Sequence, residues 1–422
     1  MRKLIRQTVL ILVPAATFVL QGCTRDTNEV ERPEKIQSKR EVIYDSVTYA
    51  KLAHLWEKYN AAYPSEDAYA NWMYATRYSS LPDYGTMLEE GVKKYPANPT
   101  LLYLSGLLKG GGRNSAEGRQ LLERATILDP NFLDPWFALV VQYMAQGDGE
   151  NTNVALRHLL EGRAIEDGVM DYSFNMLASL EAGAILITNG DNDTYPGWIL
   201  TRLLQIRPDV QIVNRSLLNT DWYPSWIMNA GVPTFISQTN LDSLRKQLMA
   251  AAAPVPPGGV FGDTLIVRII DAAERTHRPV YFSSTMDFTP VVQRYTATGR
   301  SLGLVTLVTP SEQPPRVLLR QLFTTWLHDY RTGGLDSWRL RYSPKASAGR
   351  YLIINYGASL GSLMDQIIST VPEFRLPLFR WYRAHVADAL PRDAADQVNR
   401  IWCRADSPAE IRDWCRTQGY KE

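Results

Sequence analysis

Polar and acidic side chains follow an apolar run near the middle of the chain. Ile185 to Thr188 predict a buried β-strand, and Asn189-Gly190 predicts a tight turn after it. Asp191 and Asp193 come next, and either Asp193 or Thr194 can cap the helix that follows. A polar, acidic loop at the carboxyl end of a strand is where open α/β sheets usually bind ligands.

Two further apolar runs carry polar residues at their ends in the same way. Val210 to Asn214 and Arg278 to Ser284 predict short strands, and the helix between the first two strands favours a parallel, right-handed connection. If the strands are adjacent, their carboxyl ends share one crevice. The side chains predicted to line it are Asn189, Asp191, Asp193, Thr194, Asn214, Asn219, Asp221, Ser283, Ser284 and Thr285.

These residue types fit two different roles. Carboxylates mixed with amides and hydroxyls suit a hard cation, a sugar, or a phosphate held through a cation. A divalent cation bound by Asp191 and Asp193 is therefore the one cofactor that the sequence suggests. The alternative is structural, with both aspartates capping a helix and bracing its turn, while Asn214, Asn219 and Asp221 build Asx turns.

No complete catalytic motif accompanies these residues. Asp191-Asn-Asp193 is an Asp-x-Asp pair, as in metal-dependent nucleotide-sugar transferases, but alone it is a weak signal. Thr194 directly follows Asp193, so the Asp-x-Asp-x-Thr pattern of haloacid-dehalogenase-type phosphatases is missed by one position. The sequence has no glycine-rich phosphate loop, no Gly-x-Ser-x-Gly and no His-Glu-x-x-His. A binding protein is therefore favoured over an enzyme.

The first residues have the features of a bacterial lipoprotein signal peptide. A short basic region, Arg2 to Arg6, precedes an apolar segment, Thr8 to Leu20, that is short for a membrane span. Leu20-Gln-Gly-Cys23 then matches a lipobox, with residues 1–22 removed and Cys23 lipidated. Lipidation would anchor the protein in the cell envelope, and Thr24 in place of Asp favours the outer over the inner membrane. An ordinary secretory signal or a single-span anchor is the alternative.

Two further cysteines lie near the C-terminus, Cys403 and Cys415. In an exported protein whose Cys23 carries lipid they form an even pair, so a disulfide between them is expected. A loop of this size would stabilise the fold by about 3 kcal/mol. The alternative is two half-buried free thiols, because the spacing and the absence of nearby histidines argue against zinc.

Prolines at a regular spacing organise the first part of the chain. Pro64, Pro96 and Pro130 recur near the tetratricopeptide period, and the last two follow a small residue, Gly91 or Ala125, by five positions. Residues 45–168 are therefore predicted to be tetratricopeptide-like helical repeats with a concave surface for a protein or peptide. A plain helical bundle is the alternative. Residues 23–44 are polar and are predicted to be a flexible tether.

The remaining chain divides into two parts. Residues 169–312 predict a small Rossmann-like parallel-sheet domain, whose fourth, edge strand would run from Leu302 to Val308. Residues 313–422 are predicted to be a C-terminal helical region. The expected fold class is thus α plus α/β, with tetratricopeptide-like helical repeats before the Rossmann-like domain.

Four stretches of this second half occur in a recognisable order: Thr188-Asn-Gly-Asp-Asn-Asp-Thr-Tyr-Pro196, Asn219-Thr-Asp-Trp-Tyr223, Arg278-Pro-Val-Tyr-Phe282 and Leu302-Gly-Leu-Val-Thr-Leu-Val308. The span from about Ala182 to Leu363 resembles the soluble C-terminal part of an uncharacterised bacterial family of multi-pass membrane proteins with a protein O-mannosyltransferase-like (GT-C) membrane region. In such transferases the acidic catalytic residue and the lipid-linked sugar site belong to the membrane part, which has no counterpart in this sequence. The resemblance therefore implies an accessory soluble domain.

Two functions follow from these observations as competing predictions. The first is a lipid-anchored envelope protein that binds envelope proteins through its repeats and the membrane through Cys23, as a scaffold or as an accessory subunit in glycan or secretion processes. The second is a metal-dependent sugar- or phosphate-handling enzyme that uses Asp191 and Asp193. A net charge of +1 over 422 residues argues against nucleic acid as a partner.

Overall fold

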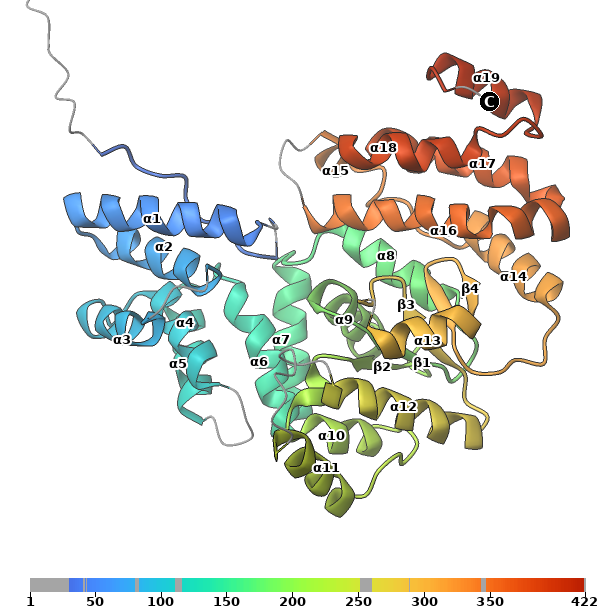
Figure 1. The fold of residues 1–422 in the computed structure, drawn as a ribbon. Helices are drawn as coiled ribbons and strands as arrows, with labels where there is room; N and C mark the ends of the chain where they lie inside the picture. The colour runs from blue at the N-terminus through green and yellow to red at the C-terminus, as the bar shows by residue number, and fades with distance from the viewer. Residues whose placement is uncertain are drawn as a thin grey trace, which may run out of the picture.

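The computed structural model describes residues 30–40, 42, 44–79, 83–110, 116–250, 260–287, 289–342 and 347–420. The predicted signal segment and Cys23 lie outside these ranges. Within them, a helical N-terminal region and a helical C-terminal region flank one small sheet (Figure 1). None of the described helices has the length and apolarity needed to cross a bilayer.

The N-terminal region is a row of antiparallel helices. They are α1 (Ser46–Ala62), α2 (Glu66–Arg77), α3 (Tyr84–Lys94), α4 (Pro99–Lys109), α5 (Ala116–Leu128), α6 (Asp134–Ala145) and α7 (Gly149–Glu161). Small residues allow close crossings, because a Cβ added to Gly106 of α4 would lie 2.9 Å from the carbonyl oxygen of Gly118 in α5. The arrangement is compatible with helical repeats.

The segment before α1 differs from the predicted tether. Residues 30–40, which we call the N-terminal arm, have no helix or strand, yet Ile36 is buried. The backbone N–H of Ile36 donates to Asn71 Oδ1 at 3.0 Å, and that of Lys39 donates to the hydroxyl of Tyr74 at 3.1 Å. The polar composition suggested disorder, but side chains of α2 accept two of the arm's backbone N–H groups and hold it in place.

A five-stranded sheet forms the centre of the molecule. Its strands are β1 (Ile185–Thr188), β2 (Gln211–Asn214), β3 (Val280–Ser283), β4 (Arg300–Leu302) and β5 (Val305–Leu307), in the order β2-β1-β3-β5-β4. As predicted, β1 pairs in parallel with β2. It also pairs in parallel with β3, whose neighbour in the sheet the sequence left open. In contrast to the prediction, the sheet is mixed, because β5 runs antiparallel to β3 and to β4.

The single edge strand predicted from Leu302 to Val308 is in fact a hairpin. Gly303 has a φ of +72°, a left-handed conformation that glycine adopts without steric cost, and it turns the chain between β4 and β5. The apolar run is continuous in the sequence, so only this turn shows that it supplies parts of two antiparallel strands.

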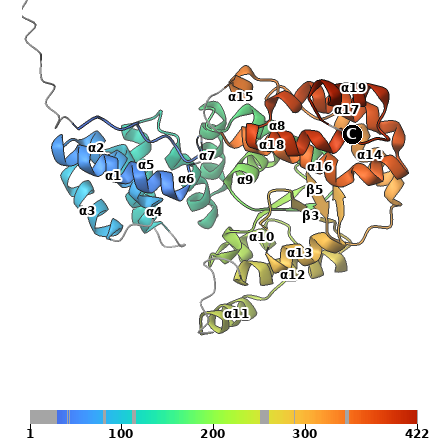
Figure 2. The same ribbon diagram turned by 45° about the horizontal axis from the view of Figure 1, so that its top comes forward.

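Helices cover both faces of the sheet (Figure 1). The helices of this part of the chain are α8 (Asp167–Ala178), α9 (Asp191–Trp198), α10 (Tyr223–Asn229), α11 (Gln238–Ala250), α12 (Val260–Arg275) and α13 (Pro290–Thr298). Of these, α11 lies farther from the sheet than the others (Figure 2). Successive residues of β3 point to opposite faces of the sheet and contact different helices. Ser283 Oγ donates to Asp193 of α9 on one face, whereas Phe282 packs edge-on against Tyr295 of α13 on the other.

The C-terminal region is helical, as the sequence predicted, and lies beside α8 and the sheet (Figure 2). Its helices are α14 (Pro315–His328), α15 (Trp338–Tyr342), α16 (Ala348–Thr370), α17 (Arg375–His385), α18 (Arg392–Asn399) and α19 (Ala409–Thr417). The Asn175 amide of α8 donates to the hydroxyl of Tyr356 in α16 at 2.8 Å. A disulfide joins Cys403 to Cys415, the pair that the sequence nominated.

Candidate functional site

The carboxyl ends of β1, β2 and β3 meet at one edge of the sheet. Thr188 lies opposite Asn214 in the β1–β2 register, and Ile187 lies opposite Phe282 in the β1–β3 register. The strand ends whose polar residues were predicted to converge are therefore adjacent and parallel. Since β2 and β3 lie on opposite sides of β1, this edge is a topological switch point, where open α/β sheets bind ligands.

Asp193 makes the hydrogen bonds that join the strand ends at this edge of the sheet. It is only 2% exposed, and its carboxylate accepts the backbone N–H groups of Asn189 at 2.8 Å and Gly190 at 2.9 Å. The hydroxyls of Ser283 and Thr285 also donate to it. Burial raises the pKa of Asp193, and the donors act in the opposite direction. The carboxylate thus ties the β1 turn to the end of β3.

The start of α9 explains why Asp193 points inward. The helix begins at Asp191, after Gly190, so Asp193 stands at the third helical position, and its carboxylate accepts the N–H of the residue before the helix. The sequence placed the helix cap at Asp193 or Thr194, three or four residues after the actual cap, Gly190. Pro196 consequently lies in the second turn of the helix, and a π-helical turn, Ile199–Leu203, follows.

The predicted amide and hydroxyl groups are also bound internally. Thr194 Oγ1 is hydrogen-bonded to Thr188 Oγ1 at 2.7 Å and accepts from Asn214 Nδ2 at 2.9 Å. Asn214 Oδ1 in turn accepts the N–H of Leu217 at 2.9 Å. This bond supports the loop after β2 but reaches one residue farther than the predicted Asx turn. Asn219 Oδ1 accepts the N–H of Gly262 at 3.0 Å and so connects the β2 loop to α12.

Three of the predicted residues are more accessible. Ser284 is exposed, but its hydroxyl is hydrogen-bonded to that of Tyr172 in α8, which also accepts from Asn355 of α16 at 3.2 Å. Asp221 is exposed, and its side chain makes no hydrogen bond to another described residue. Asn189, which is half-buried, contributes its backbone N–H to Asp193.

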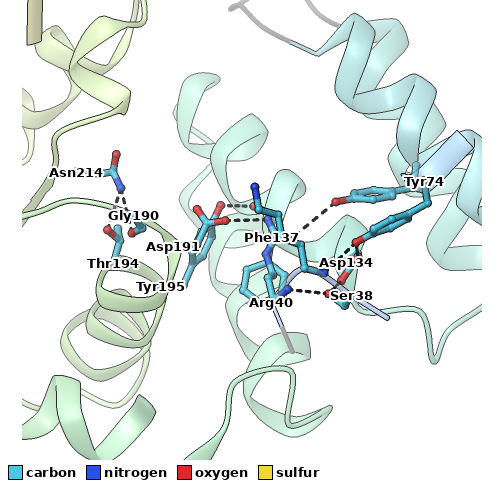
Figure 3. Close-up of polar contacts among 12 residues, drawn as sticks. Ser38, Arg40, Tyr74, Asp134, Phe137, Gly190, Asp191, Thr194, Tyr195 and Asn214 are labelled. Atoms are coloured by element: carbon cyan, nitrogen blue, oxygen red, sulfur yellow. Dashed lines mark hydrogen bonds and ion pairs between the residues drawn. The ribbon is translucent and has the colours of Figure 1, made fainter. Parts of the chain in front are cut away.

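Asp191 does not join Asp193. It is exposed on the outer side of α9, where Arg40 of the N-terminal arm reaches its carboxylate at 3.1 Å (Figure 3). Among the described residues no group of three or more histidine, cysteine or acidic side chains is placed to hold a metal ion. The Asp191 and Asp193 carboxylates thus point to different neighbours, and they do not face one common position in this structure.

The N-terminal arm adds residues that the sequence analysis missed. The Arg40 guanidinium lies 4.1 Å from the centre of the Phe137 ring of α6, besides pairing with Asp191. Two residues earlier, Ser38 Oγ donates to Asp134 Oδ1 at 2.6 Å. Figure 3 shows the arm running from this contact to α9. The arm therefore connects the N-terminal helices α1–α7, the helical row, to the residues that follow β1, Asn189 to Asp193, the strand-end loop.

Asp134 is the buried acceptor of this contact. The Tyr74 hydroxyl of α2 donates to its second oxygen at 2.9 Å. Burial and the neighbouring charge of Asp134 raise the pKa of Tyr74, so the phenol stays protonated and remains a donor. In the sequence, Asp134 comes directly before Pro135 and looks like an ordinary first residue of a helix, so its contact with the arm could not be predicted. The apolar Ile36 within a polar segment was the one sequence feature that could have indicated that the arm is anchored.

One comparison with known proteins matches the part of the chain that contains β1, α9 and β2. Residues 169–230 match the family model of TMEM260-associated domain 2. The matched segment runs from α8 through β1, α9 and β2 into α10, so it contains Asp191, Asp193 and Asn214 but neither the arm nor β3. The family is tied to a membrane glycosyltransferase-like protein, which agrees loosely with the resemblance drawn from the motifs. No curated protein and no solved structure matches the chain.

Proposed function

We propose that this protein is a lipid-anchored envelope scaffold or accessory subunit whose helical row binds a linear segment of a partner protein. The observation that carries the proposal is the way the N-terminal arm is bound. A segment without helix or strand is held by side chains of α2 and α6, which is how a helical surface receives a peptide.

The contacts to the arm divide into two kinds. Asn71 and Tyr74 accept backbone N–H groups at Ile36 and Lys39, and such contacts do not depend on the side chain of the bound residue. Asp134, in contrast, accepts from a hydroxyl side chain, that of Ser38. The backbone contacts supply affinity for any extended chain, and the side-chain contact of Asp134 supplies selectivity for a hydroxyl residue. Peptide-binding sites combine these two kinds of contact.

The Asp191 and Asp193 carboxylates already have partners within the protein, and this supports a binding role over catalysis. Asp193 accepts five internal donors, and Asp191 is paired with Arg40. A metal-dependent enzyme would need both carboxylates to turn toward one ion. The enzyme therefore stays the second candidate, motivated by Asp191-Asn-Asp193 at a topological switch point.

Two further observations support the envelope setting. Leu20-Gln-Gly-Cys23 supports a lipid anchor, outside the described residues. The match to a domain associated with a membrane glycosyltransferase-like protein supports an accessory role beside glycan transfer. The tetratricopeptide character of the helical row belongs to the same proposal, and rests on the period of Pro64, Pro96 and Pro130.

A peptide titration tests the proposal. The protein starting at Thr24 would carry Ile36→Asp, Ser38→Ala and Arg40→Ala, which release the arm, and a fluorescent peptide of residues 30–40 would be added. We expect saturable anisotropy with the released protein and weaker binding to wild type, because the attached arm competes at an effective concentration on the order of millimolar. Adding Asn71→Ala to the released protein should remove the binding.

Two results would contradict this function. One is no binding of the peptide to the released protein while circular dichroism shows that its helices are intact. The other is binding that Asn71→Ala leaves unchanged. Thermal unfolding with Mg²⁺, Mn²⁺ and Ca²⁺ tests the enzyme in parallel, since an ion at a hundredfold its Kd should add about 2.7 kcal/mol of stability. A stabilisation lost with Asp191→Ala would favour the enzyme.

A further inference from the structure

A cavity of about 520 Å³ opens where three parts of the chain meet. Gln37 and Arg40 of the arm form one wall, residues 163–168 after α7 form the second, and Gly334 to Tyr342 with α15 form the third. The volume lies within the range of about 300–1,000 Å³ that is typical of small-molecule sites. The cavity is separate from the interior of the strand-end edge, which Asp193 fills.

The walls of this cavity are fixed to one another. The N–H of Gly334 donates to Asp171 Oδ2 at 2.6 Å, and a Cβ on Gly334 would lie 2.3 Å from the backbone of Asp167. The N–H of Gly349 at the start of α16 donates to Glu166 Oε2 at 3.0 Å. The second and third walls therefore touch directly.

Two aromatic side chains stand at the mouth without being covered. Trp338 is 69% exposed and Tyr342 is 78% exposed. They are four residues apart on α15, so they lie on the same side of the helix. Large aromatic rings left in solvent together are unusual for a monomeric surface and mark contact sites, where one ring face packs against an apolar face of a ligand.

Among the described residues around the cavity, one cation has no acidic partner. Arg163 pairs with Asp167 at 3.2 Å, and Arg40 pairs with Asp191. Arg339 makes no ion pair with any acidic residue that the structure describes, and its guanidinium lies 5.6 Å from the centre of the Trp338 ring. A guanidinium beside an exposed indole offers a planar donor for an anionic oxygen next to a flat apolar surface.

The remaining wall groups indicate a ligand rich in hydroxyls. Gln37, Ser337 and the Arg163–Asp167 pair present both donors and acceptors. An apolar ligand would remove these groups from water without replacing their hydrogen bonds, which costs free energy. A sugar replaces them, because each hydroxyl both donates and accepts.

We propose that this junction cavity binds a sugar ring that carries a carboxylate or a phosphate. The apolar face of the ring stacks on Trp338, Arg339 receives the anionic group, and the hydroxyls bond to Gln37 and the Arg163–Asp167 pair. The inference goes beyond the proposed function. It requires the arm in the position that the structure shows, because Gln37 and Arg40 form one wall, whereas the arm-binding residues Asn71 and Asp134 do not line the cavity.

Ligand-observed NMR titrations on the protein starting at Thr24 test the inference. The probes are glucuronic acid, glucose 6-phosphate and glucose. We expect at least one charged sugar to bind about tenfold more tightly than glucose, as one charge-assisted contact provides. Comparing glucuronic acid with glucose 6-phosphate shows whether the anionic group is a carboxylate or a phosphate.

Variants at exposed positions assign the binding to this cavity. Arg339→Gln should abolish the preference for a charged sugar, and Trp338→Ala should weaken every sugar about tenfold. Arg316→Gln, an exposed arginine of α14 that does not line the cavity, should change nothing. The inference is overturned if no probe binds saturably, if glucose binds as tightly as both charged sugars, or if Arg339→Gln and Trp338→Ala have no effect. A short acidic peptide that displaces the sugars at lower concentration would also overturn it, and would assign the cavity to a protein partner.

Discussion

The Arg40 guanidinium of the N-terminal arm lies 3.1 Å from the Asp191 carboxylate of α9, across a sequence separation of 151 residues. The same guanidinium stacks on Phe137 of α6. One side chain thereby joins the arm, the helical row and the strand-end loop. The acidic residue that a sequence motif nominates as a metal ligand is instead one partner in this contact between parts of the chain.

Arg40→Ala should loosen the arm and the loop together. The partly exposed ion pair and the cation–π contact together contribute about 1–2 kcal/mol to the free energy of local opening. Hydrogen–deuterium exchange should therefore accelerate in peptides covering both residues 30–40 and residues 189–198. Arg32→Ala is the matched control, because Arg32 pairs with exposed Asp67 at the other end of the arm and should affect the arm alone. Unchanged exchange at residues 189–198 in Arg40→Ala would contradict the proposed connection.

Asp193 and Asp191 should differ sharply in their contribution to stability. Asp193→Ala leaves several buried donors without an acceptor, each costing about 1–3 kcal/mol, so we expect the free energy of unfolding to fall by more than about 3 kcal/mol. Asp191→Ala should cost at most about 1 kcal/mol, because that ion pair is partly exposed. Urea unfolding in EDTA measures both, and equal losses would show that Asp193 is not the internal anchor.

Asp209 should make the free energy of unfolding decrease as the pH falls. The Arg207 side chain, together with the N–H of Gly183, lowers its pKa from 3.8 to about 2. Since the folded pKa lies below the unfolded one, the stabilisation is present above about pH 4 and is lost as the pH falls toward about 2. The pair is partly exposed, so its size is at most about 1 kcal/mol.

Urea unfolding of wild type and Asp209→Asn at several pH values measures this contribution. The difference between the two proteins should be largest near neutral pH and should disappear as the pH approaches about 2. Asp221→Asn is the control, because this exposed carboxylate has no hydrogen-bonded partner among the described residues. A difference for Asp209→Asn that grows on acidification would have the wrong sign and would refute the assignment.

Removing the disulfide should destabilise the C-terminal helices in particular. The bond closes the loop between Cys403 and Cys415, and a loop of this length contributes about 3 kcal/mol in the chain-entropy model. Replacing both cysteines by serine should therefore increase proteolysis after α18, with little change in the N-terminal row. Limited proteolysis followed by mass spectrometry locates the cuts. Cleavage that first increases between α1 and α7 would contradict a local role.

Local sequence patterns were sufficient to predict much of the fold. The β-branched runs predicted β1, β2 and β3, and the helix between β1 and β2 predicted their parallel pairing, since such crossovers have one preferred hand. The predicted convergence of the strand ends followed from that pairing. The strand and β1–β2 predictions depend on residues close together in the chain, where periodicity and turn chemistry carry information. The position of β3 beside β1 joins residues far apart in the sequence and was only a condition of the prediction.

The tertiary structure decided what the converging residues do. Asp191 and Asp193 are two positions apart on a helix, which places their side chains about 200° apart around its axis, so one faces the sheet and the other faces the arm. The sequence could not reveal this, because the choice of helix start depends on which N–H groups a carboxylate reaches. The same limit applies to the arm, whose partners at Asn71, Asp134 and Asp191 are distant in the sequence and become neighbours only when the helices pack.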